Sequence, residues 1–280
     1  MNTTVKNNIW LSLLCLCCIL AASCHNDDIN GNSKSIKSLK QLEGAVIGVQ
    51  LGSTSDVLAT QLEQKGKGTK VERFTKSSDA VQALLQDKID CIVEDELPAR
   101  AFLRNNPSLS LLPEEFGHSE LAICVARDNE KLQSQMNEAI MHLQKEGVID
   151  TIVNRHLERH IATAYHSNSS SKNGTLRFAT NATFEPFEYY DEGKIVGIDV
   201  DVARAIADKM GMEMEMTDME FDAIIASVQT GKVDAGIAGL TVTPEREKNI
   251  RFTSPYFTKL RQVVIVNTDT HAHSKNITET

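Results

Sequence analysis

The stretch Gly239-Leu-Thr-Val-Thr-Pro-Glu-Arg246 determines how the whole chain is interpreted. It follows a run of small and apolar residues, 233–239, that is typical of a buried strand. Thr243 and Pro244 then begin a helix, with Thr at the N-cap and Pro in the first turn. Arg246 comes next, where the helix N-terminus already carries partial positive charge. A carboxylate bound by its guanidinium would explain this Arg, and a solvated Arg on a surface helix is the alternative that the segment leaves open.

Together with Ile250-Arg-Phe-Thr-Ser-Pro-Tyr-Phe257, the stretch resembles the signature of the periplasmic amino-acid-binding proteins of ABC importers, bacterial solute-binding protein family 3. That family carries G-x-T-x-T-x-E-R followed by a DFSxPYY block. The resemblance implies an α/β chain with two lobes, the type II periplasmic-binding-protein or Venus-flytrap fold, and a ligand between the lobes. It also implies a transport protein that captures a free α-amino acid, is not an enzyme, and needs neither cofactor nor metal.

Composition narrows the classes of partner. The 280 residues carry a formal net charge of −9, which argues against nucleic acid as a partner. Hydrophobic residues make up 41% of the chain, enough for one large or two small cores. Cys91 and Cys124 lie in apolar runs, so buried thiols are the default expectation, and the sequence leaves open whether the two are paired. No set of Cys and His residues has the spacing of a zinc site.

The N-terminal segment predicts export and anchoring. Residues 1–24 are expected to be a secretory signal peptide, because the apolar run 9–20 is too short to span a bilayer. Ala21-Ala-Ser-Cys24 resembles a lipobox with Ala where Leu is usual, which implies that Cys24 is lipidated and anchors the protein to a membrane. The polar residues 25–34 are expected to be a flexible tether. We therefore expect a lipoprotein in the periplasm of a Gram-negative bacterium.

The remaining chain divides into two predicted lobes. Residues 35–117 alternate strands with helices, which predicts a parallel α/β sheet with its ligand beyond the strand C-termini. Residues 118–268 are predicted to form the other lobe, followed by a polar tail, 269–280. Within this second lobe, residues 158–174 have the composition of a linker. We call residues 35–117 the N-terminal lobe and residues 118–268 the C-terminal lobe.

The order of the segments differs from that of the family. Residues 120–157 resemble the family's C-terminal end, and residues 176–189 resemble its beginning. The chain therefore resembles a circular permutant, in which the linker joins the family's old termini. We expect the new ends, near residues 35 and 268, to lie together at the interlobe crossing. The chain is expected to pass continuously from one lobe to the other only near residues 117–126. A free C-terminal strand at 262–268 would form the second connection, and we expect the hinge between the lobes to be looser for that reason.

The resemblance assigns a role to individual residues. Arg246, helped by Thr241 and Gly239, would bind the ligand's α-carboxylate. Asp95 would bind its α-ammonium, although the acids at 94–96 have a solvated loop as their alternative. Ser53 and Thr54 would contact the carboxylate. Phe184 and Phe221 would flank the ligand's side chain, with a core role as the alternative. Asn181, Glu94 and Gln50 would tune selectivity for a polar or basic ligand.

The implied partners are the amino acid and an ABC transporter permease in the membrane, and the protein is expected to be a monomer. Two other functions stay open at this point. One is a lipid-anchored sensor that reports the ligand to a membrane partner. The other is an enzyme similar to cyclohexadienyl dehydratase on the same fold, with Glu94, Glu185 and Glu188 as acid and base groups. No nucleophile–base–orienter set supports the enzyme.

Overall fold

The computed structural model describes residues 34–159, 165–167 and 173–269. These residues belong to one compact unit. The predicted signal peptide, the predicted lipidation site Cys24, nearly all of the tether and most of the tail lie outside the described residues, as does the middle of the linker. Within the described part of the chain, no helix combines the length and apolarity needed to cross a membrane.

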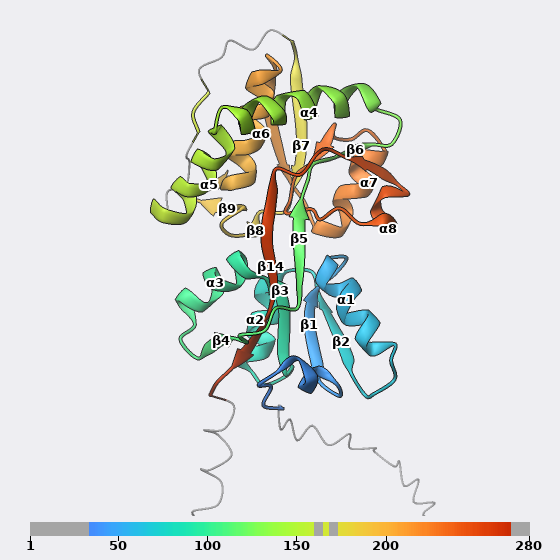
Figure 1. Cartoon of the computed structure of the whole chain (residues 1–280), viewed down its shortest axis with the longest axis vertical. Coiled ribbons are helices and arrows are strands. Elements are labelled where there is room, and N and C mark those ends of the chain that lie inside the picture. The colour runs from blue at the N-terminus through green and yellow to red at the C-terminus, as the bar shows by residue number, and fades with distance from the viewer. Residues whose placement is uncertain (1–33, 160–164, 168–172, 270–280) are drawn as a thin grey trace, which may run out of the picture. The chain divides into compact units, whose positions relative to one another are not determined.

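The N-terminal lobe is built on a mixed sheet with strand order β2-β1-β3-β14-β4, in which β14 spans Phe257–Asn267, and β5 pairs with β14 (Figure 1). β1, β2 and β3 run parallel, and β14 runs antiparallel to β3. Buried side chains from α1 pack on one face of this sheet, and those of α2 and α3 pack on the other. The elements are η1 (Leu39–Leu42), β1 (Val46–Gln50), α1 (Thr54–Glu63), β2 (Lys70–Phe74), α2 (Ser77–Leu85), β3 (Cys91–Asp95), α3 (Glu96–Asn105), β4 (Leu109–Leu111) and β5 (Gly117–Leu121).

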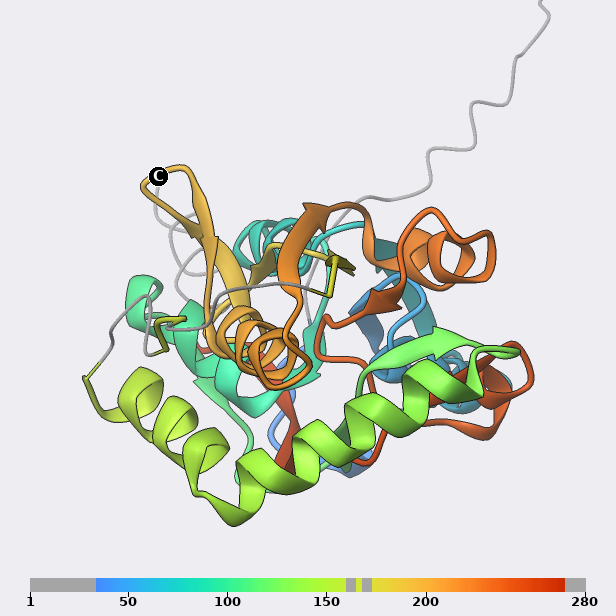
Figure 2. The same ribbon diagram turned by 90° about the horizontal axis from the view of Figure 1, so that it is seen from above.

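The C-terminal lobe has a five-stranded sheet of order β11-β7-β12-β6-β13 and a small sheet of order β10-β9-β8. Its largest core lies beneath α4, α5 and α6, which Figure 2 shows from above. The elements are β6 (Cys124–Ala126), α4 (Glu130–Lys145), α5 (Val148–Arg159), β7 (Thr175–Thr180), β8 (Thr183–Phe184), β9 (Glu188–Asp191), β10 (Lys194–Val196), α6 (Ile198–Lys209), β11 (Glu213–Asp218), η2 (Phe221–Ala223), α7 (Ile224–Gln229), β12 (Ala235–Gly236), α8 (Pro244–Glu247) and β13 (Ile250–Phe252).

Two antiparallel strands connect the lobes, β5 and β14 (Phe257–Asn267). β14 starts beside Leu121 and in the core of the C-terminal lobe, and its residues from Gln262 onward pair with β3 and β4. The expectation of a single continuous crossing with a free second strand is therefore wrong. Residues 262–267 also belong to the sheet of the N-terminal lobe, although the sequence placed them in the other lobe. Their backbone groups find hydrogen-bond partners there on both sides, which explains the placement.

The ends of the described chain also differ from expectation. Gln50 ends β1 at the interlobe cavity described below, so Val46 and the residues before it lie at the opposite end of the sheet. Asn267 pairs with Leu109 and also lies away from the cavity. Figure 1 shows both ends at the far end of the N-terminal lobe rather than at the interlobe crossing. The crossing is occupied instead by the middle of β14.

Two apolar runs of the sequence form shorter strands than their length suggests. The run 121–126 is split between β5 and β6, because the chain passes there from one sheet to the other. The expected strand at 233–239 is reduced to Ala235–Gly236. Gly239 has a φ of 56°, in the left-handed region that glycine adopts readily, so it does not continue the strand.

Candidate functional site

A cavity lies between the two lobes and encloses about 370 Å³ of space outside protein atoms, part of it open to solvent. It is placed beyond the C-terminal ends of β1, β3 and β7, as the sheet topology predicts. Every residue that the sequence assigned to ligand binding lines it, and so do Ser55, Ala238 and Glu188, which were not assigned to binding. The full lining is Gln50, Ser53, Thr54, Ser55, Glu94, Asp95, Asn181, Phe184, Glu188, Phe221, Ala238, Gly239, Thr241 and Arg246.

Arg246 is held by its own short helix and by both lobes. Thr243 caps α8 as predicted, because its hydroxyl accepts a hydrogen bond from the Arg246 backbone N–H at 3.2 Å. The guanidinium donates to the carbonyl oxygens of Thr241 at 2.7 Å and Gly52 at 3.0 Å. Its Cζ lies 5.5 Å from the ring centroid of Phe221. A guanidinium has five N–H donors, so the donors not bound to carbonyls remain for an anion.

Gly239 lets the chain pass close to an aromatic ring of the cavity. A Cβ at this position would lie 2.7 Å from Cε1 of Phe184, so a larger residue would displace the ring. Phe184 in turn stacks on Phe187 with a centroid distance of 5.7 Å. The Gly239 N–H donates to Asp199 at 2.8 Å. Gly239 therefore fixes one wall of the cavity through its shape and its backbone.

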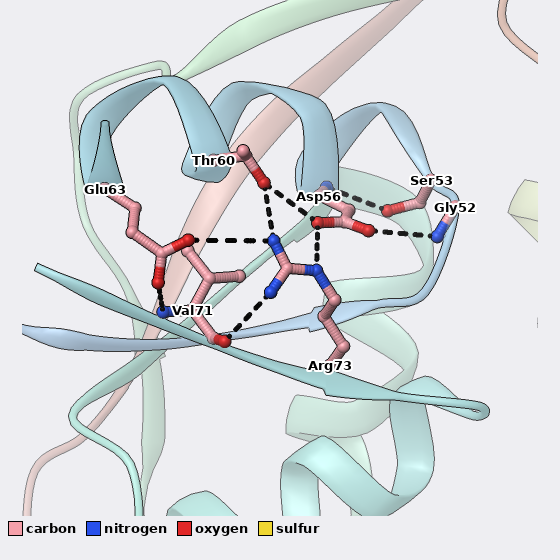
Figure 3. A network of polar contacts seen from close by, with 7 residues as sticks. All are labelled: Gly52, Ser53, Asp56, Thr60, Glu63, Val71 and Arg73. Carbon is pink, nitrogen blue, oxygen red and sulfur yellow. Dashed lines mark hydrogen bonds and ion pairs between the residues drawn. The ribbon is translucent and has the colours of Figure 1, made fainter. Parts of the chain in front are cut away.

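A polar network fixes the turn between β1 and α1 (Figure 3). Asp56 accepts from the Gly52 N–H at 3.1 Å, and its own N–H donates to the hydroxyl of Ser53. Arg73, on β2, donates through Nε to Asp56 at 2.9 Å. Arg73 also donates to the hydroxyl of Thr60 at 2.7 Å. The network holds Ser53 and the Gly52 carbonyl at the edge of the cavity.

Two adjacent acids of β3, Glu94 and Asp95, are buried in the N-terminal lobe's part of the lining. The hydroxyl of Ser119 donates to Asp95 at 3.1 Å. Burial raises the pKa of Asp95 to about 8, and the neighbouring charge of Glu94 adds to this effect. Burial also raises the pKa of Glu94. The solvated-loop alternative for these two acids is therefore wrong.

Glu188 is a third buried acid in the lining, from β9 of the C-terminal lobe. Burial raises its pKa well above the usual range, and the charge of Asp199 adds to the rise. Sequence reasoning considered Glu188 only as an acid group of an enzyme. The signal that was available is its position four residues after Phe184, which was assigned to flank the ligand.

Polar contacts of side chains and backbone also bring the lobes together. Gln50 donates to the side-chain oxygen of Asn181 at 3.1 Å, in a buried position. Arg246 reaches Gly52, as described above. At another edge of the interface, Arg104 of α3 forms an ion pair with Glu185 of the C-terminal lobe. The structure therefore represents a state in which the lobes are in contact.

The part of the chain that the structure describes contains two cysteines, Cys91 and Cys124. Cys91 and Cys124 are buried free thiols, so the two are not paired with each other. Burial raises the pKa of both thiols, that of Cys124 to about 12, which makes them poor nucleophiles. Among the described residues, no group of three or more His, Cys, Asp or Glu side chains is placed to hold a metal ion.

Comparison with known proteins points to amino-acid-binding proteins. The arginine-binding extracellular protein ArtP of Bacillus subtilis is 41% identical over 100 residues, which are 35% of this chain and 39% of ArtP. A putative ABC transporter arginine-binding protein 2 of Escherichia coli is 43% identical over 84 residues, 30% of this chain and 35% of that protein. This chain thus spans less than two fifths of each of these relatives. A solved structure of an ancestral arginine-binding protein bound to arginine is 53% identical and covers 30% of this chain and 38% of its own, with a TM-score of 0.30. Residues 176–277, which run from β7 through β14, match the model of the bacterial extracellular solute-binding proteins, family 3.

Proposed function

We propose that this protein binds a free α-amino acid between its two lobes. The observation that carries the proposal is that Arg246 and Asp95, which belong to different lobes, line the same cavity. An α-amino acid is a zwitterion, so its carboxylate matches the guanidinium and its ammonium matches the carboxylate. Charge-assisted hydrogen bonds of this kind are the strongest that a protein offers to such a ligand. The remaining positions of the lining would contact the side chain.

The ligand's side chain is polar or basic in this proposal. Asp95 would be used by the ammonium, which leaves Glu94 and Glu188 as two further buried acids in the lining, against Arg246 as the lining's one basic residue. A cationic side chain would neutralise this excess of acidic groups, whereas an apolar one would leave it uncompensated. The names of the relatives, several of which are arginine-binding proteins, support the same choice.

Binding would act through closure of the lobes about β5 and β14. A ligand that touches both lobes binds the closed state better than the open one and shifts the equilibrium toward it. Moving an open-to-closed ratio from 99:1 to 1:99 needs about 5.5 kcal/mol of differential affinity. One guanidinium–carboxylate pair and one ammonium–carboxylate pair, both removed from water on closure, are of the right order to supply it.

The wider assignment follows the same proposal. The protein would be a monomeric lipoprotein, anchored through Cys24 in the periplasm of a Gram-negative bacterium, that delivers its ligand to an ABC transporter permease. Its chain would be a circular permutant of the family order. The matched segment 176–277 supports this order, because it starts only after both helices that resemble the family's C-terminal end.

Calorimetric titration tests the binding proposal. The full chain, purified in detergent and refolded to remove bound ligand, would be titrated with each of the twenty amino acids. Micromolar or tighter binding of one or two, lost in Arg246→Ala and in Asp95→Ala, is the expected result. A wild-type protein that binds none of the twenty would overturn the proposal.

A further inference from the structure

The carboxyl group of Asp95 is held by one side chain from each of the two strands that connect the lobes. Ser119 of β5 donates to Asp95 Oδ1 at 3.1 Å, and both residues are buried. Gln262 of β14 lies directly opposite Asp95 in the sheet, and its side chain is also hydrogen-bonded to the Asp95 carboxyl. Neither Ser119 nor Gln262 lines the cavity, so their effect on a ligand would pass through Asp95.

Gln262 also ties Asp95 to the start of α1. The residue is 1% exposed, and its Nε2 donates to the hydroxyl of Thr54 at 2.9 Å and lies 3.4 Å from the hydroxyl of Ser55. An amide nitrogen carries two hydrogens, so one can reach Thr54 while the other reaches the carboxylate. Thr54 lines the cavity together with Asp95. The amide therefore lies between the proposed ammonium site and a residue assigned to the ligand's carboxylate.

The neighbouring strand leaves room for this amide because residue 117 is glycine. Gly117 pairs with Gln262 across β5 and β14, and a Cβ at position 117 would lie 2.8 Å from Gln262 Oε1. The φ of Gly117 lies outside the left-handed region, so no turn of the backbone requires a glycine here. The space at this position therefore serves the side chain of Gln262.

The surroundings of Asp95 oppose a charged carboxylate. Burial raises its pKa, and the charge of Glu94 raises the pKa further. The hydrogen bonds from Ser119 and Gln262 lower the pKa, as does the charge of Arg246. Among the described residues, Glu94 and Arg246 are the charged groups that act on Asp95. An ammonium ligand requires the ionised form, so the two donors favour the form that binds it.

We propose that Ser119 and Gln262 are positioning residues for ligand binding, which keep the Asp95 carboxylate ionised and oriented toward the ligand's ammonium group. This inference rests on the proposed amino-acid binding and adds two residues that do not contact the ligand. Both belong to the strands about which the lobes would close. The charge of the ammonium site would therefore depend on the geometry of those strands.

The test uses the full refolded chain, free of ligand and with L-arginine. Gln262→Met keeps the length of the side chain and removes its donors. Ser119→Ala removes the hydroxyl, and Ser119→Thr retains one. Gln82→Met and Ser78→Ala, at exposed positions of α2, are the matched controls. Carbon-13 NMR of the Asp95 carboxyl, assigned with Asp95→Asn, measures the pH at which this group titrates, and calorimetry at pH 8 measures affinity.

Loss of either donor should raise the pKa of Asp95 in the ligand-free protein, because the donors stabilise its charged form. We expect a rise of about one to two pH units in Gln262→Met and in Ser119→Ala, the equivalent of one charged hydrogen bond. The smaller ionised fraction should then weaken the binding of L-arginine at pH 8 by about 5- to 50-fold. Ser119→Thr should stay closer to the wild type than Ser119→Ala in both measurements, and the controls should match the wild type.

An unchanged titration of Asp95 in the folded variants would overturn the inference. A loss of affinity without a shift of the titration would overturn it too, because altered packing alone would then explain the loss. A shifted titration with undiminished affinity would mean that the ligand does not use the charge of Asp95. Ser119→Ala removes a single oxygen, so it decides the question if Gln262→Met does not fold. A wild type that binds no amino acid would contradict the proposed function instead, and the ligand-free titrations would still test the two donors.

Discussion

Arg246 of the C-terminal lobe donates a hydrogen bond through Nη2 to the carbonyl oxygen of Gly52 in the N-terminal lobe, at 3.0 Å. The residue proposed to bind the ligand's carboxylate therefore also contacts the opposite lobe. Its second bond, to the Thr241 carbonyl, fixes the guanidinium in its own lobe. Ligand binding and lobe closure would thus depend on the same planar group, whose donors point in fixed directions.

Arg246→Lys tests the need for that geometry. Lys keeps the charge but has one ammonium group instead of a planar fork, so it cannot bind both carbonyls and a carboxylate in the same arrangement. We expect amino-acid affinity to fall about 10- to 100-fold, the equivalent of one or two charged hydrogen bonds. Calorimetric titration measures it, with Arg100→Lys on α3 as a control, since Arg100 is an exposed partner of Glu96. If Arg246→Lys binds the amino acid as tightly as the wild type, binding does not depend on the planar guanidinium.

The raised pKa of Asp95 predicts that the affinity for the ligand depends on pH. That pKa is raised to about 8 in the ligand-free cavity, chiefly by burial, so at pH 6 Asp95 carries a proton. An ammonium ligand needs the carboxylate, and binding must then release that proton. Affinity should rise by up to about tenfold per pH unit from pH 6 to 8 and level off above. Titrations in buffers of different ionisation enthalpy count the protons released, and an affinity that stays flat over this range would contradict the assignment.

The same raised pKa predicts that the contribution of Asp95 to the free energy of unfolding falls as the pH rises, whereas the affinity for the ligand increases. An acid whose folded-state pKa lies above its unfolded value binds its proton more tightly in the folded protein. Its contribution to stability is complete below the unfolded pKa of about 3.9 and is lost as the pH rises to about 8. Asp95→Asn removes this titration, so the variant should gain stability relative to wild type between pH 4.5 and 8. Urea unfolding at the two pH values measures the gain, and a variant that loses relative stability over this interval would contradict it.

Substitutions of Arg104 and Arg100 compare an ion pair between the lobes with an ion pair within one helix. The two residues lie one turn apart on α3, but Arg104 pairs with Glu185 of the other lobe, and Arg100 pairs with Glu96 of its own helix. Exposed ion pairs contribute about 0–1 kcal/mol, so Arg104→Met should weaken ligand binding by at most about fivefold, through a faster dissociation rate. Arg100→Met should leave binding unchanged. Stopped-flow dissociation kinetics compare the two, and equal effects would assign no role to the interlobe pair.

Much of the candidate site was predictable from the sequence because its residues follow strand ends and a helix cap. Thr243, Pro244 and Arg246 form the predicted helix start, and Asp95 ends the predicted strand in the opposite lobe. Asp95 and Arg246 belong to different sheets, so local patterns predicted the strand end and the helix start, and the family resemblance brought the two residues to one site. Their roles in binding remain a proposal.

The features that the sequence did not predict depend on contacts far apart in the chain. β14 extends from one lobe into the other because Gln262–Ile265 find partners on β3, and no local pattern records that pairing. Glu188 escaped assignment because its environment comes from Asp199 and the cavity rather than from its neighbours. Burial of an acid is decided by tertiary packing, and a short polar segment such as 188–191 gives no sign of it.

Arg73 should influence ligand binding without touching the cavity. Its contacts with Asp56 and Thr60 hold the turn that carries Ser53 and Gly52 (Figure 3). Arg73→Met should reduce the free energy of unfolding by about 1–2 kcal/mol, because Arg73 is partly exposed, and weaken binding by several-fold. Urea unfolding and calorimetry measure the two effects.

The matched control for Arg73→Met is Lys70→Met, at an exposed position of the same strand. It removes the same charge without changing the turn. The Arg73→Met protein could instead lose stability and still bind the ligand with unchanged affinity. That result would mean that the turn keeps its geometry without the bond from Arg73 to Asp56, and that the network has only a structural role.

The proposed circular permutation predicts that the family order can be restored. A chain that starts at Gly174 and ends at Ser167, with residue 269 joined to residue 34 through about 20 Gly and Ser residues, would keep both crossing strands intact. The new ends would fall between α5 and β7, and the joined ends both lie at the far end of the N-terminal lobe (Figure 1). We expect this protein to fold and to bind the same amino acid within about threefold, because permutation at surface connections preserves the core contacts. The control is the natural order with the same Gly and Ser segment added after residue 269, and calorimetry with circular dichroism compares them. A reordered chain that fails to fold while the control folds would mean that the natural order is needed for the structure, and the permutation proposal would then fail.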